Sequence, residues 1–242
     1  MEALTAVGPG AYERWRASAL GRITERLEED LIFKLTGPLE GRRLLDAGCG
    51  DGRLLALAAA RGAKATGLDP DSAMLASARE RARREGITAR FLEGRIERLP
   101  FADGSFDIVL AVTVLSFVAD APLAFREMAR VLRPGGRLVL GELGLFSSWA
   151  AIRRLRALFG SSLWRAARFL SARELAALTE KAGLELVALK GAVHYPPTAL
   201  CARLFAPFEP FLEGLLFGAA FIALGACKKV GPAGLEPATT PL

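Results

Sequence analysis

Histidine and cysteine are scarce in this chain of 242 residues, which has one histidine and three cysteines. The cysteines, Cys49, Cys201 and Cys227, are widely separated and odd in number. This spacing predicts neither a disulfide framework nor a metal-binding cluster. We therefore expect a cytoplasmic protein without a bound metal.

Long apolar runs and targeting signals are lacking as well. The N-terminal segment holds no apolar stretch behind a basic start, so the sequence predicts no secretory signal. The longest apolar run, residues 214–227, is shorter than the roughly 20 residues that a membrane-spanning helix needs. We expect no membrane span, while the arginine-rich residues 144–170 leave peripheral contact with a membrane open.

Acidic residues are outnumbered by basic ones, 26 against 32, which gives a formal net charge of +6. Such a balance is typical of proteins that bind nucleic acid or anionic membranes, and also of helices with solvated arginines. In the segment ARERARREG, residues 78–86, Glu80 and Arg84 lie four apart and support a helix in water. We favour this last interpretation.

Apolar runs of strand length alternate with stretches of helical periodicity along most of the chain. The expected strands lie at 42–47, 63–69, 88–93, 106–112, 136–143, 184–193 and near 217–227, the last without a helix before it. Because parallel strands need a long crossover connection, usually a helix, the alternation predicts a Rossmann-like α/β fold. Its doubly wound, mostly parallel sheet has seven strands, and the last strand is antiparallel.

Composition divides the chain into five expected segments. A helical segment, 1–40, precedes a core at 41–143 that ends with the fifth strand. Residues 144–170 form a connection far longer than the usual 2 to 6 residues, so we expect a helical cap or lid there. Residues 171–229 complete the same domain, and 230–242 form a disordered tail without an apolar pattern.

The segment LLDAGCGDGR, residues 44–53, places three glycines at the end of the first strand and before a helix. Without Cβ atoms, Gly48, Gly50 and Gly52 allow a sharp turn and let a ligand lie directly on backbone N–H groups. Asp69 ends the second strand, where an acidic side chain can accept hydrogen bonds from ribose hydroxyls. The pattern predicts a nucleotide-like ligand.

Four motifs in order resemble the class I S-adenosylmethionine-dependent methyltransferases, within their small-molecule group that shares the methyltransferase type 11 domain. The motifs are LLDAGCGDG, GLDPDSAML, LPFADGSFDIVLA and REMARVLRPGGRLVLGE. The N-terminal residues Tyr12 and Trp15 match a Y-x-x-W pattern of the same family. The resemblance implies S-adenosylmethionine as the cofactor.

The resemblance also implies which residues surround this cofactor. Asp46 and the glycine loop would hold its methionine part, Asp69 its ribose, and Arg95 stands where the family usually has an acidic residue for the adenine. That departure leaves the adenine contact to the backbone of Ile96 or to another side chain. The implied cofactor-binding residues are Tyr12, Asp46, Gly48, Cys49, Gly50, Asp69, Pro70, Met74, Arg95, Ile96, Glu97, Ala111, Val112 and Leu115.

Catalytic residues are not assigned by the resemblance, because the stretch after the fourth strand has no histidine. His194 and Tyr12 are the candidates for a catalytic group, although a structural role for His194 is the interpretation we favour. Trp149 on the expected cap helix, with Ile152, Leu155 and Phe159, would form an apolar face over the acceptor. Tyr195 is the other candidate for acceptor binding.

We expect a methyltransferase that acts on a small, apolar or aromatic acceptor. A nucleic-acid methyltransferase would fit the charge, but no Asn-Pro-Pro-Tyr-like motif follows the fourth strand, so nucleic acid is disfavoured as a partner. A noncatalytic S-adenosylmethionine-binding protein is the other alternative. A nicotinamide dehydrogenase is the least favoured, because its third glycine is replaced by Arg53. The sequence predicts neither the methylated atom nor the oligomeric state.

Overall fold

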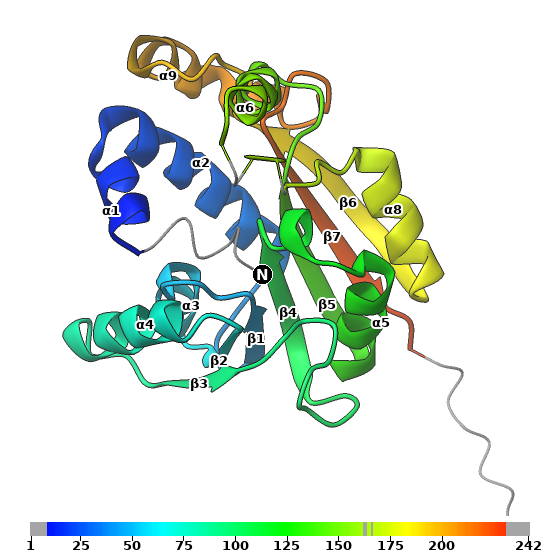
Figure 1. The fold of residues 1–242 in the computed structure, drawn as a ribbon. Helices are drawn as coiled ribbons and strands as arrows, with labels where there is room; N and C mark the ends of the chain where they lie inside the picture. The colour runs from blue at the N-terminus through cyan, green and yellow to red at the C-terminus, as the bar shows by residue number, and fades with distance from the viewer. Residues whose placement is uncertain (1–8, 162–163, 166, 231–242) are drawn as a thin grey trace, which may run out of the picture.

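A seven-stranded sheet with helices on both faces forms the protein (Figure 1). The computed structural model describes residues 9–161, 164–165 and 167–230. The strands are β1 (Arg43–Ala47), β2 (Lys64–Asp69), β3 (Ala89–Glu93), β4 (Phe106–Val112), β5 (Leu132–Leu143), β6 (Leu184–Ala192) and β7 (Phe221–Lys228). Their order in the sheet is β3-β2-β1-β4-β5-β7-β6, and only β7 runs antiparallel to its neighbours.

The helices account for most of the remaining described residues. The α-helices are α1 (Pro9–Ala17), α2 (Ala19–Thr36), α3 (Arg53–Ala60), α4 (Ser72–Arg84), α5 (Ala121–Val131), α6 (Ser148–Leu158), α8 (Ala172–Lys181), α9 (Ala199–Phe205) and α10 (Glu209–Leu212). Two short 3₁₀ helices are η1 (Leu115–Phe117) and η2 (Ala206–Phe208). None of the helices in the described part of the chain is long and apolar enough to cross a membrane.

The central strands are apolar on both faces because each face is covered. In β4, Ile108 and Leu110 pack into one buried cluster with α2 and α3, whereas Val109 between them packs into a second cluster with α5. This is the alternation that a strand imposes on successive side chains. It explains why the β4 sequence reads as an almost continuous apolar run, as in sheets covered on both sides.

The fold class expected from the sequence is confirmed, and three details differ. The expected N-terminal helical segment consists of two helices, because the chain breaks at Ser18, whose Oγ accepts a hydrogen bond from the N–H of Gly21. β5 begins at Leu132, before the Pro134–Gly135 turn, and β7 begins only at Phe221. The expectation of no helix before the last strand is wrong, since α9, η2 and α10 lie there and Pro207 and Pro210 keep them short.

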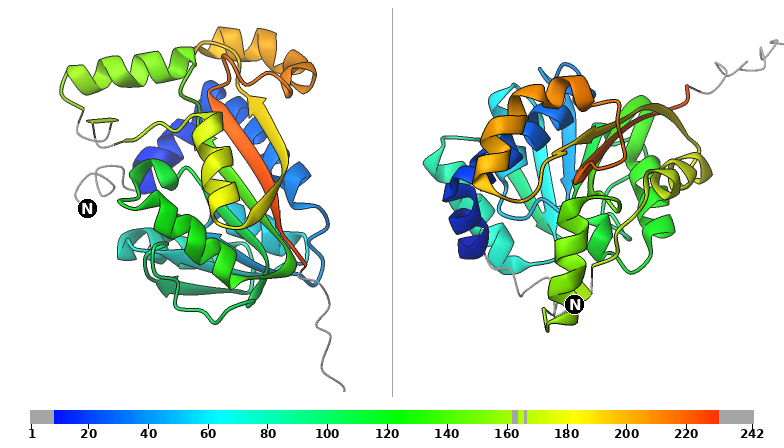
Figure 2. Two further views of the ribbon diagram at one scale, coloured as in Figure 1. Left: turned by 90° about the vertical axis from the view of Figure 1, so that its right-hand side faces the viewer. Right: turned by 90° about the horizontal axis from the view of Figure 1, so that it is seen from above.

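The strand order reverses between β1 and β4, which are neighbours although β2 and β3 separate them in sequence. In open α/β sheets, ligands bind beyond the carboxyl ends of the strands at this point. Helices α6 and α9 lie at the same end of the molecule, beyond the ends of β5 and β6 (Figure 2). The expected boundaries of a cap and a core stay predictions, and residues 231–242 of the expected tail lie outside the described residues.

Candidate functional site

The loop between β1 and α3 holds three glycines in the left-handed region of backbone space. The φ angles of Gly48, Gly50 and Gly52 are +87°, +53° and +76°. A Cβ atom at Gly48 would lie 2.6 Å from Val114, and one at Gly52 would lie 2.8 Å from Ala78, so both glycines are required by packing. A Cβ atom at Gly50 would meet nothing within 4 Å. Gly50 therefore presents bare backbone to open space, where a ligand could lie against it.

Asp69 at the end of β2 holds this loop in place. Its Oδ2 accepts a hydrogen bond from the N–H of Gly50 at 2.8 Å, and its Oδ1 accepts one from the N–H of Asp71 at 2.9 Å. Each carboxylate oxygen has a further lone pair that can accept from a ligand hydroxyl. Burial raises the pKa of Asp69, and the two backbone hydrogen bonds oppose that rise. These acceptor oxygens thus fit the hydroxyls of a ribose beside the glycine loop.

Asp46, at the end of β1, and Cys49, in the glycine loop, are both buried. Burial, together with the charges of Asp69 and Asp51, raises the pKa of Asp46 to about 7. Burial also raises the pKa of the Cys49 thiol, and the negative charge of Asp46 and Asp69 adds to the effect. A neutral thiol is a poor nucleophile, so Cys49 acts as a small buried side chain of the loop.

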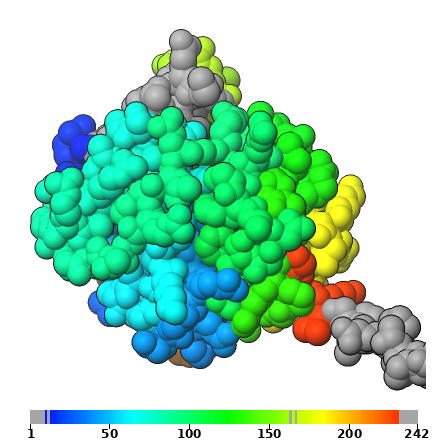
Figure 3. Space-filling view, turned by 90° about the horizontal axis from the view of Figure 1, so that it is seen from below, coloured from blue at the N-terminus to red at the C-terminus, as the bar shows by residue number. Residues whose placement is uncertain are grey.

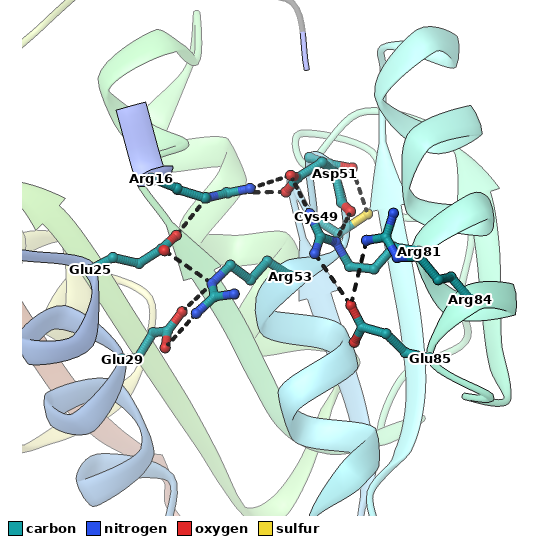
Figure 4. A network of polar contacts seen from close by, with 10 residues as sticks. Arg16, Glu25, Glu29, Cys49, Asp51, Arg53, Arg81, Arg84 and Glu85 are labelled. Carbon is teal, nitrogen blue, oxygen red and sulfur yellow. Dashed lines mark hydrogen bonds and ion pairs between the residues drawn. The ribbon is translucent and has the colours of Figure 1, made fainter. Parts of the chain in front are cut away.

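Asp51, also in the loop, joins it to two helices that are distant in sequence (Figure 4). Arg16 of α1 donates to both of its carboxylate oxygens, and Arg81 of α4 donates from Nη2 to Oδ2 at 2.9 Å. Burial alone would raise the pKa of Asp51, but these hydrogen bonds and ion pairs outweigh it and hold the pKa below its ordinary value. The N-terminal helix is therefore fastened to the loop by a charged pair.

Arg53 fastens the loop to α2 as well. Its Nε lies 2.5 Å from Glu29 Oε1 and 3.1 Å from Glu25 Oε2, and Glu25 in turn lies 2.6 Å from Arg16 Nε. From the sequence, Arg53 served only to exclude a third glycine, and the network of Arg16, Asp51 and Arg81 was not predicted. Nothing in the local pattern identifies these partners, because they are brought together only by the packing of α1, α2 and α4.

The residues expected around the adenine lie at the adjoining ends of β2 and β3. Pro70 is exposed beside Asp69, and Met74 is buried in the first turn of α4. Ile96 is buried after β3, and Arg95 lies 2.9 Å from Glu97, with which it forms an ion pair. Because Asp69 and Glu93 are partners in the β2–β3 register, these segments share one edge of the sheet.

Glu142 positions the segment that follows β4. It is buried near the end of β5, where its Oε1 accepts from the N–H of Leu115 at 2.8 Å and its Oε2 from the hydroxyl of Ser116 at 2.9 Å. Ala111 is buried, Val112 is half-buried, and Thr113 has a φ of +54°, which is rare for a β-branched residue. The conformation of Thr113 was not predicted, since threonine carries no sequence signal for it.

Replacing Glu142 with glutamine is expected to flatten the pH dependence of stability. Burial raises the pKa of Glu142 to about 7, although its hydrogen bonds lower it. An acid whose pKa rises on folding stabilises the fold below its unfolded pKa, and that stability is lost as the pH rises toward 7. Glu142→Gln keeps an acceptor for Leu115 and cannot ionise. Thermal unfolding of both proteins from pH 5 to pH 8 should show the larger loss in the wild type.

A matched variant separates ionisation from hydrogen bonding at this position. Glu142→Ala removes both acceptors and cannot ionise either, so it should be about 2–3 kcal/mol less stable than Glu142→Gln at every pH. If the wild type and Glu142→Gln gave parallel pH profiles, Glu142 would not titrate between folded and unfolded states as described.

His194 follows β6 and has both ring nitrogens engaged. Nδ1 lies 2.9 Å from Glu209 Oε2, and Nε2 lies 2.7 Å from the carbonyl oxygen of Leu215. Burial lowers the pKa of His194, but these hydrogen bonds outweigh burial and raise the pKa above its ordinary value. Glu209 also accepts from the backbone N–H groups of Val193 and His194. This arrangement supports a structural role for His194, the interpretation favoured from the sequence.

Trp149 and Tyr195, the two residues expected at the acceptor, anchor α6 to the end of β6. The indole Nε1 of Trp149 donates to the carbonyl oxygen of Tyr195 at 2.8 Å, and the Tyr195 hydroxyl lies 3.1 Å from Thr24 Oγ1. Their exposed fractions are only 8% and 1%. The expected single apolar face of α6 is therefore wrong: Trp149 points into the protein, while Ile152, Leu155 and Phe159 are exposed.

Tyr12 lies in α1, but its side chain lies outside the described part of the structure, so its expected contact with the cofactor stays a prediction. Within the described residues, no group of three or more His, Cys, Asp or Glu side chains is arranged to hold a metal ion.

The chain is similar to known proteins in sequence and in fold. A family profile described as a methyltransferase domain matches residues 45–140. An uncharacterized protein of Mycobacterium tuberculosis is 35% identical over 231 residues, 95% of this chain and 76% of that protein. A ubiquinone biosynthesis O-methyltransferase of Alkalilimnicola ehrlichii is 33% identical over 178 residues, 70% of this chain and 71% of that protein.

Among solved structures, a SAM-dependent methyltransferase of Thermotoga maritima has the same fold. It is described as a possible histamine N-methyltransferase, and its TM-score is 0.69 at 26% identity. The superposition covers 91% of this chain and 95% of that one.

Proposed function

Because the chain belongs to the class I S-adenosylmethionine-dependent methyltransferases, we propose that it transfers a methyl group to a small, apolar or aromatic acceptor. The observation that carries this choice is the apolar segment after β4, which borders the glycine loop. Val114 in that segment packs against Gly48, and Leu115 is buried beneath it. The relative named for ubiquinone biosynthesis, 33% identical, supports the same class of acceptor.

The cofactor site proposed here is the glycine loop with the end of β2. Gly50 offers bare backbone, Asp69 offers carboxylate lone pairs, and Asp46 lies buried at the end of β1. Bound S-adenosylmethionine supplies a methyl group that its sulfonium charge already activates. The protein therefore has to hold the acceptor close, in line and away from water.

The described residues can position the acceptor. Glu142 fixes the backbone of Leu115 and Ser116, so the apolar segment after β4 keeps its place beside the loop. The Trp149–Tyr195 hydrogen bond fixes α6 at the same end of the sheet. We propose that the acceptor lies between these two elements.

An aromatic hydroxyl suits this site better than an aliphatic alcohol. The only histidine of the chain, His194, has both ring nitrogens bonded, so our proposal includes no imidazole base. A phenol has a pKa of roughly 10 and gives up its proton far more readily than an alkyl alcohol. Such an acceptor needs less help from a protein base.

The acceptor class is tested by the transfer of a radiolabelled methyl group to paired compounds. Each pair shares one phenol or aniline group and differs in an added alkyl or prenyl chain. We expect kcat/KM to be at least tenfold higher for the compound with the chain, because roughly 1–3 kcal/mol is gained for each methylene-sized apolar contact. Transfer confined to small hydrophilic amines would contradict the proposal.

A further inference from the structure

Exposed apolar side chains gather at one end of this molecule. Twelve of the fourteen large apolar side chains that are exposed among the described residues belong to two segments. Five lie on or beside α6, and seven lie between Leu200 and Phe217, in α9, η2, α10 and the turn after them. We call these two segments, residues 146–159 and 200–217, the apolar rim. A concentration of exposed apolar side chains of this kind is typical of an interaction site.

Helix α6 turns its apolar side outward. Trp149 and Ala150 are buried against the protein, whereas Ile152, Leu155 and Phe159, spaced by three and four residues, form an exposed stripe. The exposed fraction of Phe159 is 84%. A helix that served only the core would place this stripe inward.

The second segment is exposed in the same way. Leu200 and Leu204 lie one turn apart on α9, and Phe208 and Phe211 continue the apolar surface along the short helices that follow. Phe211 is 86% exposed. The left view of Figure 2 shows α9 and α6 at the same end of the molecule. Figure 3 shows the opposite face, formed mainly by the segments from α3 to the start of β5.

Around the first segment of the rim the charge is of one sign, and the two acidic residues of the second segment, Glu209 and Glu213, are already paired with His194 and Lys34. No acidic residue lies between Glu142 and Glu174, while this stretch holds six arginines. Arg154 and Arg156 are exposed on the two sides of the apolar stripe of α6. Arginine side chains in this position can extend to lipid phosphates while the stripe enters the apolar layer.

The charge of the apolar rim decides between two partners, a second copy of the chain and an anionic lipid surface. In an isologous contact that packs α6 on α6 of a second copy, the arginines of both helices would face each other without acidic residues in this stretch to neutralise them. An anionic lipid surface neutralises the arginines instead, and it covers the exposed apolar side chains beside them. The observations therefore favour lipid.

We propose that the apolar rim docks on the surface of an anionic lipid bilayer, with Phe159 and Phe211 entering the membrane and Arg154 and Arg156 contacting lipid phosphates. Because the rim lies beyond the carboxyl ends of β5 and β6, docking places the proposed acceptor site against the membrane. The docking surface does not depend on the proposed acceptor, and it is tested without turnover.

Flotation of the full-length protein with lipid vesicles tests the proposal. The vesicles contain phosphatidylcholine alone or with 30 mol% phosphatidylglycerol, a fraction of roughly the magnitude at which anionic surfaces attract basic segments. We expect the wild type to float with the anionic vesicles and at least tenfold less with the neutral ones. Phe159→Ser/Phe211→Ser and Arg154→Gln/Arg156→Gln should each lower the partition coefficient at least tenfold.

Matched substitutions away from the rim are the controls. Val187→Ser replaces an exposed apolar side chain of β6, and Arg83→Gln/Arg84→Gln replaces two exposed arginines of α4. Both should float like the wild type, and circular dichroism should show all variants folded. Failure of the wild type to float, or equal flotation of the rim variants, would overturn the proposal. So would a dimer in light scattering that Phe159→Ser/Phe211→Ser converts to a monomer while vesicle binding is absent.

Discussion

Asp69→Asn is expected to weaken the binding of S-adenosylmethionine about a hundredfold. The substitution removes the carboxylate charge and forces the new amide to place its N–H₂ group against the N–H of Gly50 or of Asp71. Loss of a hydrogen bond to a charged group costs roughly 1.5–3 kcal/mol, and tenfold in affinity corresponds to about 1.4 kcal/mol. Calorimetric titration measures the dissociation constant directly.

Asp107→Asn is the matched control for this prediction. Asp107 is also buried and also accepts a hydrogen bond from a backbone N–H, that of Arg43 at 2.7 Å, but it lies at the start of β4. Asp107→Asn should lose stability in thermal unfolding and keep the affinity for S-adenosylmethionine within about twofold. Equal affinities for Asp69→Asn and Asp107→Asn would remove Asp69 from the site.

Gly50→Leu is expected to abolish binding of the cofactor. Gly50 has a φ of +53°, and the space that its Cβ would enter is open in the structure. The leucine side chain would therefore occupy the proposed cofactor site. Backbone strain alone costs roughly 1–2 kcal/mol and acts on folding. The loss of binding should therefore exceed any loss of stability.

Gly86→Leu is the control that separates the effect of backbone strain from the effect of filling the cofactor site. Gly86 has a φ of +66°, and a Cβ atom there also meets nothing within 4 Å, but Gly86 follows α4, away from the glycine loop. Both variants should lose similar stability in thermal unfolding, and only Gly50→Leu should lose binding in the titration. If both variants bound S-adenosylmethionine like the wild type, the open space at Gly50 would not be the cofactor site.

Local sequence patterns predicted those elements whose signals are local. The capping box of Ser171 and Glu174 placed the start of α8, and both of its hydrogen bonds are present. The apolar runs placed the strands because burial on both faces requires them. Short helices such as α9 and α10 carry too few residues for a periodic pattern, and they were missed.

Only the glycine loop and the position of Asp69 in the candidate site were predictable from the sequence; the long-range side-chain contacts were not. The glycine spacing and the position of Asp69 follow from the strand–loop–helix pattern, and the structure brings Gly50 and Asp69 within hydrogen-bond distance. The contacts of Arg16 with Asp51 and of Glu142 with Ser116 join residues 35 and 26 positions apart. Such pairs are set by tertiary packing, which no window of sequence contains.

The orientation of α6 was likewise not predictable from local sequence. Spacing alone grouped Trp149 with Ile152, Leu155 and Phe159 as one apolar face, since all four share helical periodicity. The hydrogen bond from Trp149 to the carbonyl of Tyr195 turns the helix so that its tryptophan is buried and the stripe is exposed. The orientation of an amphipathic helix depends on what the rest of the chain offers it.

Calorimetric titration of the wild-type protein tests whether the glycine loop and Asp69 hold S-adenosylmethionine. The titrants are S-adenosylmethionine, its demethylated product and NAD under one set of conditions. We expect micromolar binding of the first two and none of NAD, because Arg53 stands at the position of the third dinucleotide-binding glycine and is bound to Glu29. No binding of S-adenosylmethionine, or a preference for NAD, would contradict this assignment.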